Sequence, residues 1–145
     1  MPDVDLRSRA TYSEWVSHTI RYNDQDPLGH VNNSVYSTFL EQGRTAFLHP
    51  FFKADDDRKI DIVLARVVID YVKELTFPGS VDIGTCVLRL GTKSVTFGNG
   101  IFKGGTDECV ATGEAVLVFF DLDARQSIVP PPHIRAVLEK MVKGG

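Results

Sequence analysis

Apolar and small residues recur every three or four positions between residues 33 and 49, which is typical of one face of an α-helix. The residues on this face are Tyr36, Phe39, Leu40, Gly43 and Phe47. Asn32 or Asn33 is a suitable N-cap, because an asparagine side chain can accept a hydrogen bond from a free amide of the first turn. We expect the helix to begin there and to end at Pro50.

The pattern changes after residue 62, where β-branched residues become frequent and apolar positions alternate. The expected strands cover residues 62–72, 81–90, 94–103 and 110–122. A short strand at 18–22 precedes the helix, and a second helix is expected to run from the prolines at 130–132 to the end of the chain. This order of elements predicts an α+β fold with an antiparallel sheet.

Side chains on the expected strands indicate how helix and sheet pack. In the strand at 62–72, five residues are expected to share one face: Val63, Ala65, Val67, Ile69 and Tyr71. In the strand at 110–122, three small residues line one face and cannot fill the space alone: Ala111, Gly113 and Ala115. A helix can lie directly against such a face, and helix 33–49 is the long candidate. We therefore expect the sheet to wrap around it.

The amino-acid composition and net charge limit the classes of protein to which the chain can belong. With 43% apolar and 24% charged residues in a chain of 145, the sequence is that of one globular domain covering residues 1–145. A net charge of −3 argues against a nucleic-acid partner, which needs an excess of Lys and Arg on one face. No apolar run suits a membrane span and no signal peptide is visible, so we expect a cytoplasmic protein with Cys86 and Cys109 as free thiols.

Polar residues gather in the segment NDQDPLGHVNNSVY, residues 23–36, just before the predicted helix. The spacing Asp-x-Asp-x-x-Gly from Asp24 to Gly29 resembles the start of a calcium loop. Two positions of such a loop that must supply a ligand oxygen hold Leu28 and Val35, whose side chains have none. A zinc site could combine the two carboxylates with the nearby imidazole, and it would need further ligands from distant parts of the chain. We therefore predict no metal site.

Several residues of this segment allow both a structural and a chemical role. Asp26 is either a turn residue before Pro27 or a carboxylate that faces a substrate carbonyl, as a nucleophile or a general base. His30 can fix the loop by a hydrogen bond or contact a substrate. Asn32 and Asn33 start the helix, whose free first-turn amides can stabilise a developing negative charge.

The segment resembles the loop that precedes the central helix in the hot-dog fold acyl-CoA thioesterases of the 4-hydroxybenzoyl-CoA thioesterase-like superfamily. The residues that carry the resemblance are Tyr22, Asp24, Asp26, Gly29, His30, Val31, Asn32, Asn33 and Tyr36. Glu41 and Arg44 on the helix fit the same pattern. The likeness covers residues 19 to 138, approximately, which is most of the chain.

The resemblance implies a hot-dog fold, in which a five-stranded antiparallel sheet wraps around a long central helix. It also implies a homodimer with a continuous ten-stranded sheet, often paired into a homotetramer, with active sites at the dimer interface. The implied reaction is hydrolysis of an acyl thioester of coenzyme A or of an acyl carrier protein, without a cofactor.

The resemblance also implies roles for single residues. Asp26 is the expected nucleophile or general base, the Asn33 amide holds the thioester oxygen, and His30 completes the catalytic set. Asp24 is expected to be structural. Five residues are expected to contact the substrate, the last three through the coenzyme A phosphates: Asn32, Tyr36, Arg89, Lys93 and Ser94.

Two other functions are compatible with the same fold. One is a hydratase or dehydratase of acyl thioesters, which needs a different arrangement of Asp and His, so the sequence His-Val-Asn-Asn at residues 30–33 argues against it. The other is a protein that binds acyl thioesters without hydrolysing them, and the presence of Asp26 argues against that.

Overall fold

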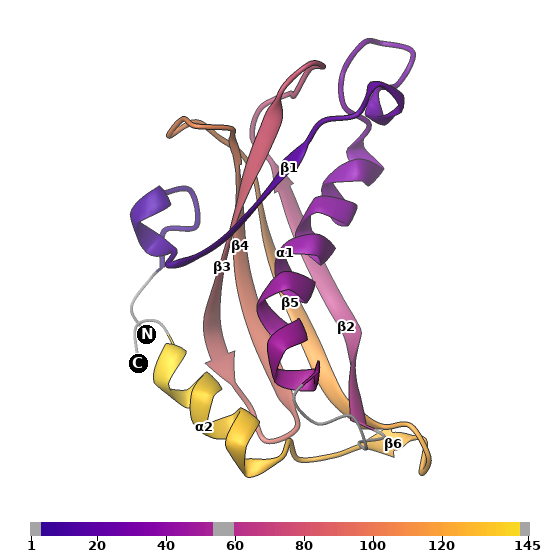
Figure 1. Ribbon diagram of the computed structural model, residues 1–145, viewed down its shortest axis with the longest axis vertical. Helices are drawn as coiled ribbons and strands as arrows, with labels where there is room; N and C mark the ends of the chain where they lie inside the picture. The colour runs from indigo at the N-terminus through magenta and orange to yellow at the C-terminus, as the bar shows by residue number, and fades with distance from the viewer. Residues whose placement is uncertain (1–3, 54–59, 143–145) are drawn as a thin grey trace.

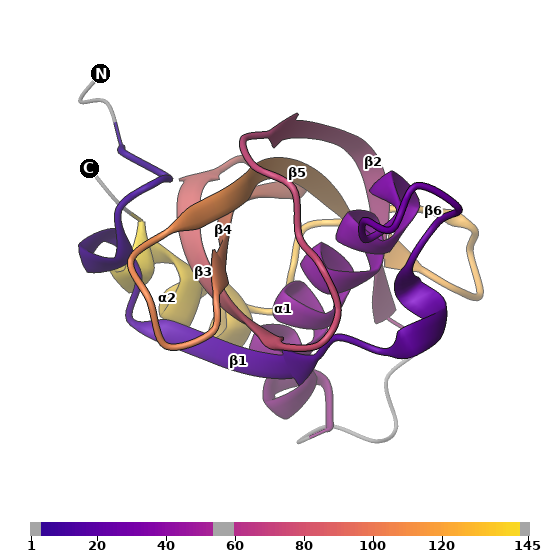
Figure 2. The same ribbon diagram turned by 90° about the horizontal axis from the view of Figure 1, so that it is seen from above.

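The sheet determines the shape of the molecule. In the computed structural model, which describes residues 4–53 and 60–142, six strands form one antiparallel sheet. Five of them lie in the order β1-β3-β4-β5-β2, and the short β6 pairs with β5. Their bounds are β1 (Glu14–Thr19), β2 (Ile60–Tyr71), β3 (Ser80–Leu90), β4 (Ser94–Lys103), β5 (Cys109–Asp121) and β6 (Gln126–Ser127). The sheet curls around helix α1 (Asn33–Lys53), so the α+β prediction is confirmed, with β6 as an added strand (Figures 1 and 2).

Helix α1 begins where the capping argument places it. The Oδ1 atom of Asn32 accepts hydrogen bonds from the backbone amide of Ser34 at 2.9 Å and from its hydroxyl at 2.8 Å. The prediction that Pro50 ends the helix is wrong, because α1 continues to Lys53. Pro50 lies in the last turn, where its missing N–H removes a single hydrogen bond close to the end of the helix.

Two glycines let α1 approach the sheet closely. A Cβ atom on Gly113 of β5 would lie 2.8 Å from Cδ1 of Leu40. A Cβ atom on Gly43 of the helix would lie 2.7 Å from Cγ2 of Ile83 on β3. Both distances are too short for real contacts, so the spacing between helix and sheet depends on these glycines. The prediction that a helix lies against the small-residue face of β5 is confirmed.

Strand β2 carries a β-bulge that changes which side chains face the helix. Its register with β5 skips one residue between Leu64 and Arg66, which leaves Ala65 as the extra residue. The alternation of faces is displaced at a bulge. Val63 therefore points away from the face of Val67, and the prediction that all five residues share one face is wrong.

Strand β2 is also an edge strand with exposed apolar side chains. It pairs only with β5, and α1 packs mainly against β1, β3 and β4. The exposed fraction is between 37% and 50% for each of these β2 residues: Val63, Leu64, Val67, Val68 and Tyr71. The free edge of β2 and the seam between α1 and β2 therefore form an apolar surface that the single chain leaves open.

Strand β1 lies earlier in the chain than the predicted 18–22. It ends at Thr19, and the residues that follow lie outside the strand. The Ile20 amide donates to the carbonyl of Gly79 at 2.8 Å, and Tyr22–Asp24 forms a single 3-10 turn. The expected strands at 81–90, 94–103 and 110–122 agree with β3, β4 and β5 to within one residue.

The N-terminal segment covers part of the outer face of the sheet. A Cβ atom on Gly84 would lie 2.5 Å from the Tyr12 ring, and one on Gly98 would lie 2.7 Å from Leu6. Arg9 holds this segment in place, because it donates to the carboxylate of Asp82 at 3.1 Å. The outer face is therefore covered beside β1 by residues that precede the sheet.

Asp82 accepts three hydrogen bonds, one of them from this segment. It accepts from the Gly105 amide at 3.0 Å, the Ser17 hydroxyl at 2.8 Å and the Arg9 guanidinium. Burial raises the pKa of Asp82, but these hydrogen bonds and the charge of Arg9 outweigh burial and hold the pKa below its ordinary value. The folded state therefore gains stability from the ionised carboxylate, and this gain is lost as the pH falls through the depressed pKa.

Asp82→Asn is expected to lower the free energy of unfolding by about 1–3 kcal/mol near neutral pH, because the amide accepts weaker hydrogen bonds than the carboxylate. The deficit should shrink in acid, where the wild-type carboxylate is protonated as well. Thermal unfolding from pH 7 to pH 3 measures both effects. A deficit of constant size over that range would contradict the assigned role of the charge.

Helix α2 (Pro132–Met141) packs at the far end of the sheet, where Arg135 donates to the carbonyl of Gly91 in the β3–β4 hairpin at 2.9 Å. Cys86 and Cys109 are buried, and within the described residues neither forms a disulfide, as expected. The sequence also predicts a charged connection at 51–59; residues 51–53 belong instead to α1, and the rest lies outside the described residues, as does the end of the predicted second helix. Within the described part of the chain, no helix is both long and apolar enough to cross a membrane.

Candidate active site

The loop between β1 and α1 brings the predicted catalytic residues to one cavity. Its volume is about 350 Å³, and it lies at the end of the molecule where α1 begins and β2 ends. The residues that line it are Asp26, Leu28, His30, Val31, Asn33, Tyr36, Tyr71, Val72, Lys73 and Glu74. The cavity therefore combines a loop, a helix start and a strand end that are far apart in the sequence.

The Asp26 carboxylate is held by the backbone of its own loop. Its Oδ1 atom accepts the amides of Leu28 at 2.9 Å and His30 at 3.4 Å. The turn closes through the Gly29 amide, which donates to the Asp26 carbonyl at 3.0 Å, and Gly29 has a φ of +87° that favours glycine. Its Oδ2 atom makes no hydrogen bond or ion pair within residues 4–53 and 60–142. One carboxylate oxygen is thus fixed and the other is available.

The first turn of α1 offers an available donor beside this carboxylate. Asn32 accepts the amide of Ser34 through its side chain and the amide of Val35 through its carbonyl, each at 2.9 Å. No acceptor for the Asn33 amide lies among the described residues. Amides at a helix start carry a partial positive charge, so the Asn33 amide is suited to an oxygen that gains negative charge.

His30 and the helix start are tied to the segment that follows β2. The Nε2 atom of His30 lies 3.0 Å from Oε2 of Glu74, and the Tyr71 hydroxyl donates to the carbonyl of Asn33 at 3.2 Å. Sequence reasoning missed Glu74 and Tyr71. Neither belongs to the local loop pattern, and both reach the cavity only because β2 runs back towards the start of α1.

Tyr36 forms a wall of the cavity rather than an exposed contact. Its side chain is buried, and its ring meets that of Tyr71 edge-on with 5.2 Å between centroids. Burial raises the pKa of the Tyr36 hydroxyl, which donates to the carbonyl of Lys73 at 3.5 Å. The predicted contact between Tyr36 and a substrate is therefore limited to the part of the ring that lines the cavity.

Asp24 has the structural role expected of it. It is 2% exposed, and its carboxylate accepts the Arg21 amide at 2.7 Å and the Arg21 guanidinium at 2.8 Å. These bonds fix the turn that precedes Asp26. Within the described ranges, no group of three or more His, Cys, Asp or Glu side chains is arranged to hold a metal ion.

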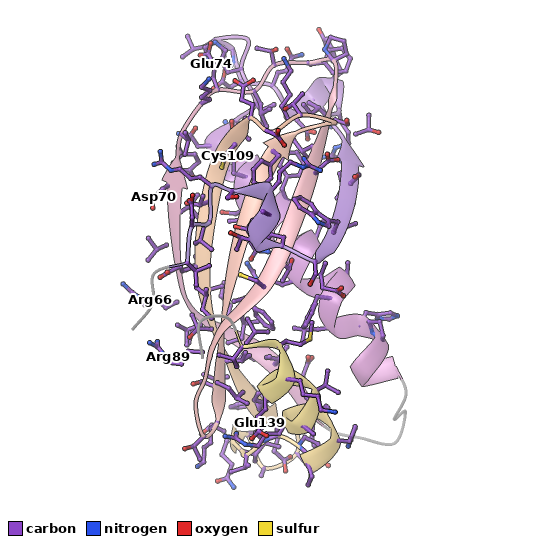
Figure 3. All side chains as sticks on the ribbon, turned by 90° about the vertical axis from the view of Figure 1, so that its left-hand side faces the viewer. Arg66, Asp70, Glu74, Arg89, Cys109 and Glu139 are labelled. Atoms are coloured by element: carbon purple, nitrogen blue, oxygen red, sulfur yellow. The ribbon has the colours of Figure 1, made fainter. Side chains whose placement is uncertain are left out.

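The residues predicted to bind phosphates lie elsewhere in the single chain. Arg89, Lys93 and Ser94 belong to the β3–β4 hairpin, at the end of the sheet opposite to Glu74 (Figure 3). Ten residue steps along β3 correspond to about 33 Å. One chain therefore assembles Asp26, His30, Asn33 and Tyr36 at one end, and the three hairpin residues remain at the other.

A family model for the thioesterase-like superfamily matches residues 20–138. The chain belongs to this superfamily. Membership supports thioester hydrolysis as its general chemistry, and the prediction of a hot-dog fold is confirmed. Among curated protein sequences, none matches the chain significantly.

Solved structures of similar proteins agree with this assignment. The chain is 26% identical to the PA5185 protein of Pseudomonas aeruginosa, covering 95% of this chain and 97% of that one, with a TM-score of 0.86. A predicted thioesterase from Bacillus stearothermophilus is 27% identical, with 88% and 95% covered and a TM-score of 0.80. YbaW, a probable thioesterase from Escherichia coli, is 25% identical, with 90% and 100% covered and a TM-score of 0.78.

Proposed function

We propose that the protein is an acyl-CoA thioesterase that hydrolyses an acyl or aroyl thioester to the free acid and the thiol. This proposal rests on one observation: two groups with complementary chemistry line the same cavity. These are the Asp26 carboxylate, with one oxygen fixed and one available, and the unfilled Asn33 amide at the start of α1. Thioester hydrolysis needs a nucleophile or general base together with a donor for the oxyanion.

Either of two routes is compatible with this geometry. In one, Asp26 takes a proton from water, the hydroxide adds to the thioester carbonyl, and the tetrahedral intermediate expels the thiolate, which recovers the proton. In the other, the Asp26 carboxylate itself adds to the carbonyl and expels the thiolate, which leaves an anhydride that water then hydrolyses. In both, the negative charge develops on the carbonyl oxygen, where the Asn33 amide can donate.

A protein of the same fold that binds CoA supports the proposed substrate class. A Staphylococcus aureus protein with a TM-score of 0.80 to this chain, but only 13% identity, has been solved in complex with CoA. We propose that the carrier of the acyl group here is coenzyme A or the related arm of an acyl carrier protein. Arg89, Lys93 and Ser94 supply cationic and hydroxyl donors suited to its phosphates.

A second copy of the chain would bring these donors close to Asp26. We propose a homodimer formed along the free edge of β2, which can pair further into a homotetramer. Antiparallel pairing of two β2 strands about a two-fold axis places the hairpin end of one copy beside the α1-start end of the other. Sedimentation analysis measures the assembly, and a monomer at micromolar concentrations would contradict this part of the proposal.

The experiment that tests the function is an assay of thiol release from a panel of alkyl and aryl acyl-CoA substrates. Turnover of at least one member is expected. Binding of acyl-CoA without any release of thiol would favour the alternative of a thioester-binding protein. Formation of a hydrated or dehydrated acyl-CoA without release of thiol would favour a hydratase or dehydratase.

Glu74→Ala is expected to lower kcat/KM for thiol release by about two- to fivefold, because His30 loses the acceptor for its Nε2 proton. Glu74→Gln should retain most of the activity, since the amide oxygen can still accept that proton. Glu139→Ala on α2, far from the cavity, is the matched control (Figure 3). Equal losses in the alanine and glutamine variants would show that Glu74 does not act by orienting His30.

A further inference from the structure

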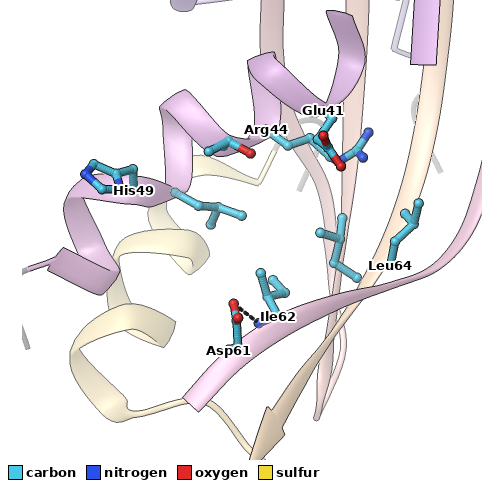
Figure 4. A pocket seen from close by; sticks show the side chains of 9 residues that line it. Glu41, Arg44, His49, Asp61, Ile62 and Leu64 are labelled. Carbon is cyan, nitrogen blue, oxygen red and sulfur yellow. Dashed lines mark hydrogen bonds between the residues drawn. The ribbon is translucent and has the colours of Figure 1, made fainter. Parts of the chain in front are cut away.

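Two cavities lie between α1 and β2. The cavity that Arg44 lines lies on the face that the proposed dimer along β2 would cover (Figure 4). The other is the cavity around Asp26, where a contact joins the end of β2 to the start of α1. In this contact the Tyr71 hydroxyl donates to the carbonyl of Asn33 at 3.2 Å. Because both residues belong to one chain, the contact is formed without a second copy.

The two peptide groups on either side of Asn33 are held at three of their four polar atoms. In the group that precedes Asn33, the carbonyl of Asn32 accepts the amide of Val35 at 2.9 Å. In the group that follows it, the Asn33 carbonyl accepts the Tyr71 hydroxyl. The Ser34 amide of the same group donates to Oδ1 of Asn32 at 2.9 Å. The fourth polar atom is the nitrogen of the Asn33 amide, so the neighbouring contacts set the direction of that donor.

The contact from Tyr71 differs from the other two because it comes from the sheet. The two contacts of Asn32 reach only two and three residues along the chain, so they turn together with the helix start. A contact with the sheet also fixes the helix start relative to the rest of the cavity. The Val31 amide, which donates to the carbonyl of Leu75 at 2.8 Å, holds the loop in a similar way two residues before Asn33. Tyr71 is therefore the link from β2 to the first residue of α1.

Tyr71 is itself held firmly. It is the last residue of β2 and lies opposite Ala111 of β5. The amides of the two residues that follow it both donate to the carbonyl of Val110, at 2.9 and 3.1 Å. The Tyr71 ring meets the ring of Tyr36, which is 2% exposed, edge-on with 5.2 Å between centroids. The hydroxyl therefore has a defined position, although half of the Tyr71 residue is exposed.

We propose that Tyr71 is a positioning residue, whose hydroxyl holds the start of α1 against the end of β2 so that the Asn33 amide points at the thioester oxygen. The inference rests on the proposed function, because it assigns the Asn33 amide to the oxyanion. The Tyr71 proton is engaged by the Asn33 carbonyl, so Tyr71 acts through Asn33 and does not donate to the substrate. A donor stabilises developing charge best when it is already in place, because turning it during the reaction costs free energy.

Tyr71→Phe is expected to lower kcat for thiol release from acyl-CoA by about three- to tenfold, as for the loss of one neutral hydrogen bond, with KM nearly unchanged. Phenylalanine keeps the ring and its contact with Tyr36. Tyr12→Phe is the matched control, because the Tyr12 hydroxyl also donates to a backbone carbonyl, that of Leu6 at 2.6 Å, on the outer face of the sheet. Its kcat should equal that of the wild type.

The ratio of the two kinetic constants separates positioning from other roles of Tyr71. A raised KM with an unchanged kcat would show that the hydroxyl binds the substrate, and it would overturn the proposal. Because Tyr71 ends the edge strand, sedimentation analysis of both variants accompanies the assay. A loss of kcat that occurs together with dissociation of the assembly would assign Tyr71 to the contact between copies and would also overturn the proposal.

The order parameter of the Asn33 backbone amide, measured by NMR relaxation of the full chain without substrate, tests the positioning separately from the reaction. It should fall in Tyr71→Phe and keep its wild-type value in Tyr12→Phe. An unchanged order parameter or an unchanged kcat in Tyr71→Phe would contradict the assigned role. A lower order parameter in a protein whose wild type releases no thiol would uphold the positioning of the Asn33 amide and contradict the proposed function alone.

Discussion

Asp26→Asn is expected to reduce kcat for thiol release by at least about a hundredfold, the usual loss when a general base or nucleophile is removed. Asparagine has nearly the same shape as aspartate, and its Oδ1 atom can still accept the amides of Leu28 and His30. The loop should therefore keep its conformation. The amide cannot take a proton from water or add to a carbonyl, so the chemical step is lost and binding remains.

The measurement is thiol release at saturating acyl-CoA, together with the dissociation constant for CoA. Asp107→Asn is the matched control, since the Asp107 side chain is 96% exposed and lies in the turn between β4 and β5. Its activity should equal that of the wild type. An Asp26→Asn protein with full activity would show that another group performs the chemistry, whatever the fold.

Gly113→Val is expected to lower the free energy of unfolding by about 2–3 kcal/mol and the Tm by about 4–10 °C. The new Cβ atom would lie 2.8 Å from Cδ1 and 3.3 Å from Cδ2 of Leu40. Leu40 is 1% exposed, so its side chain has little space into which to move. The helix must shift away from β5, or the side chains must adopt unfavourable rotamers.

Thermal unfolding followed by circular dichroism measures this loss. Glu114→Val places the same residue one position further along β5, on the exposed outer face. Because valine favours strands, that control should be close to neutral. Similar losses in the two variants would indicate that valine disturbs the strand itself, and the close contact between α1 and β5 would then not explain the effect.

The helix and the catalytic loop are predictable because their signals are local. The helical spacing from Tyr36 to Phe47 and the capping by Asn32 involve neighbours within one or two turns. The hydrogen bonds that hold Asp26 likewise join residues at most four positions apart. Interactions of this kind depend little on the rest of the chain, so a short segment specifies them.

The errors in the predicted elements have longer-range causes. The bulge at Ala65 arises from the register between β2 and β5, which a repeating pattern within one strand does not reveal. The end of β1 at Thr19 coincides with the start of its partner strand, because Thr19 lies opposite Ser80, the first residue of β3. In each case a partner distant in the sequence decides the boundary.

By itself, the sequence determined the α+β class and the start of α1, and it singled out the loop at Asp26 as the candidate site, because periodicity, capping and the loop pattern act over a few residues. Only the tertiary structure decided which distant groups join that loop, such as Glu74 beside His30. It also decided that Arg89 lies at the end of the sheet opposite to Glu74 and that Arg44 is buried. Strand order and packing set these distances, and they depend on the whole chain at once.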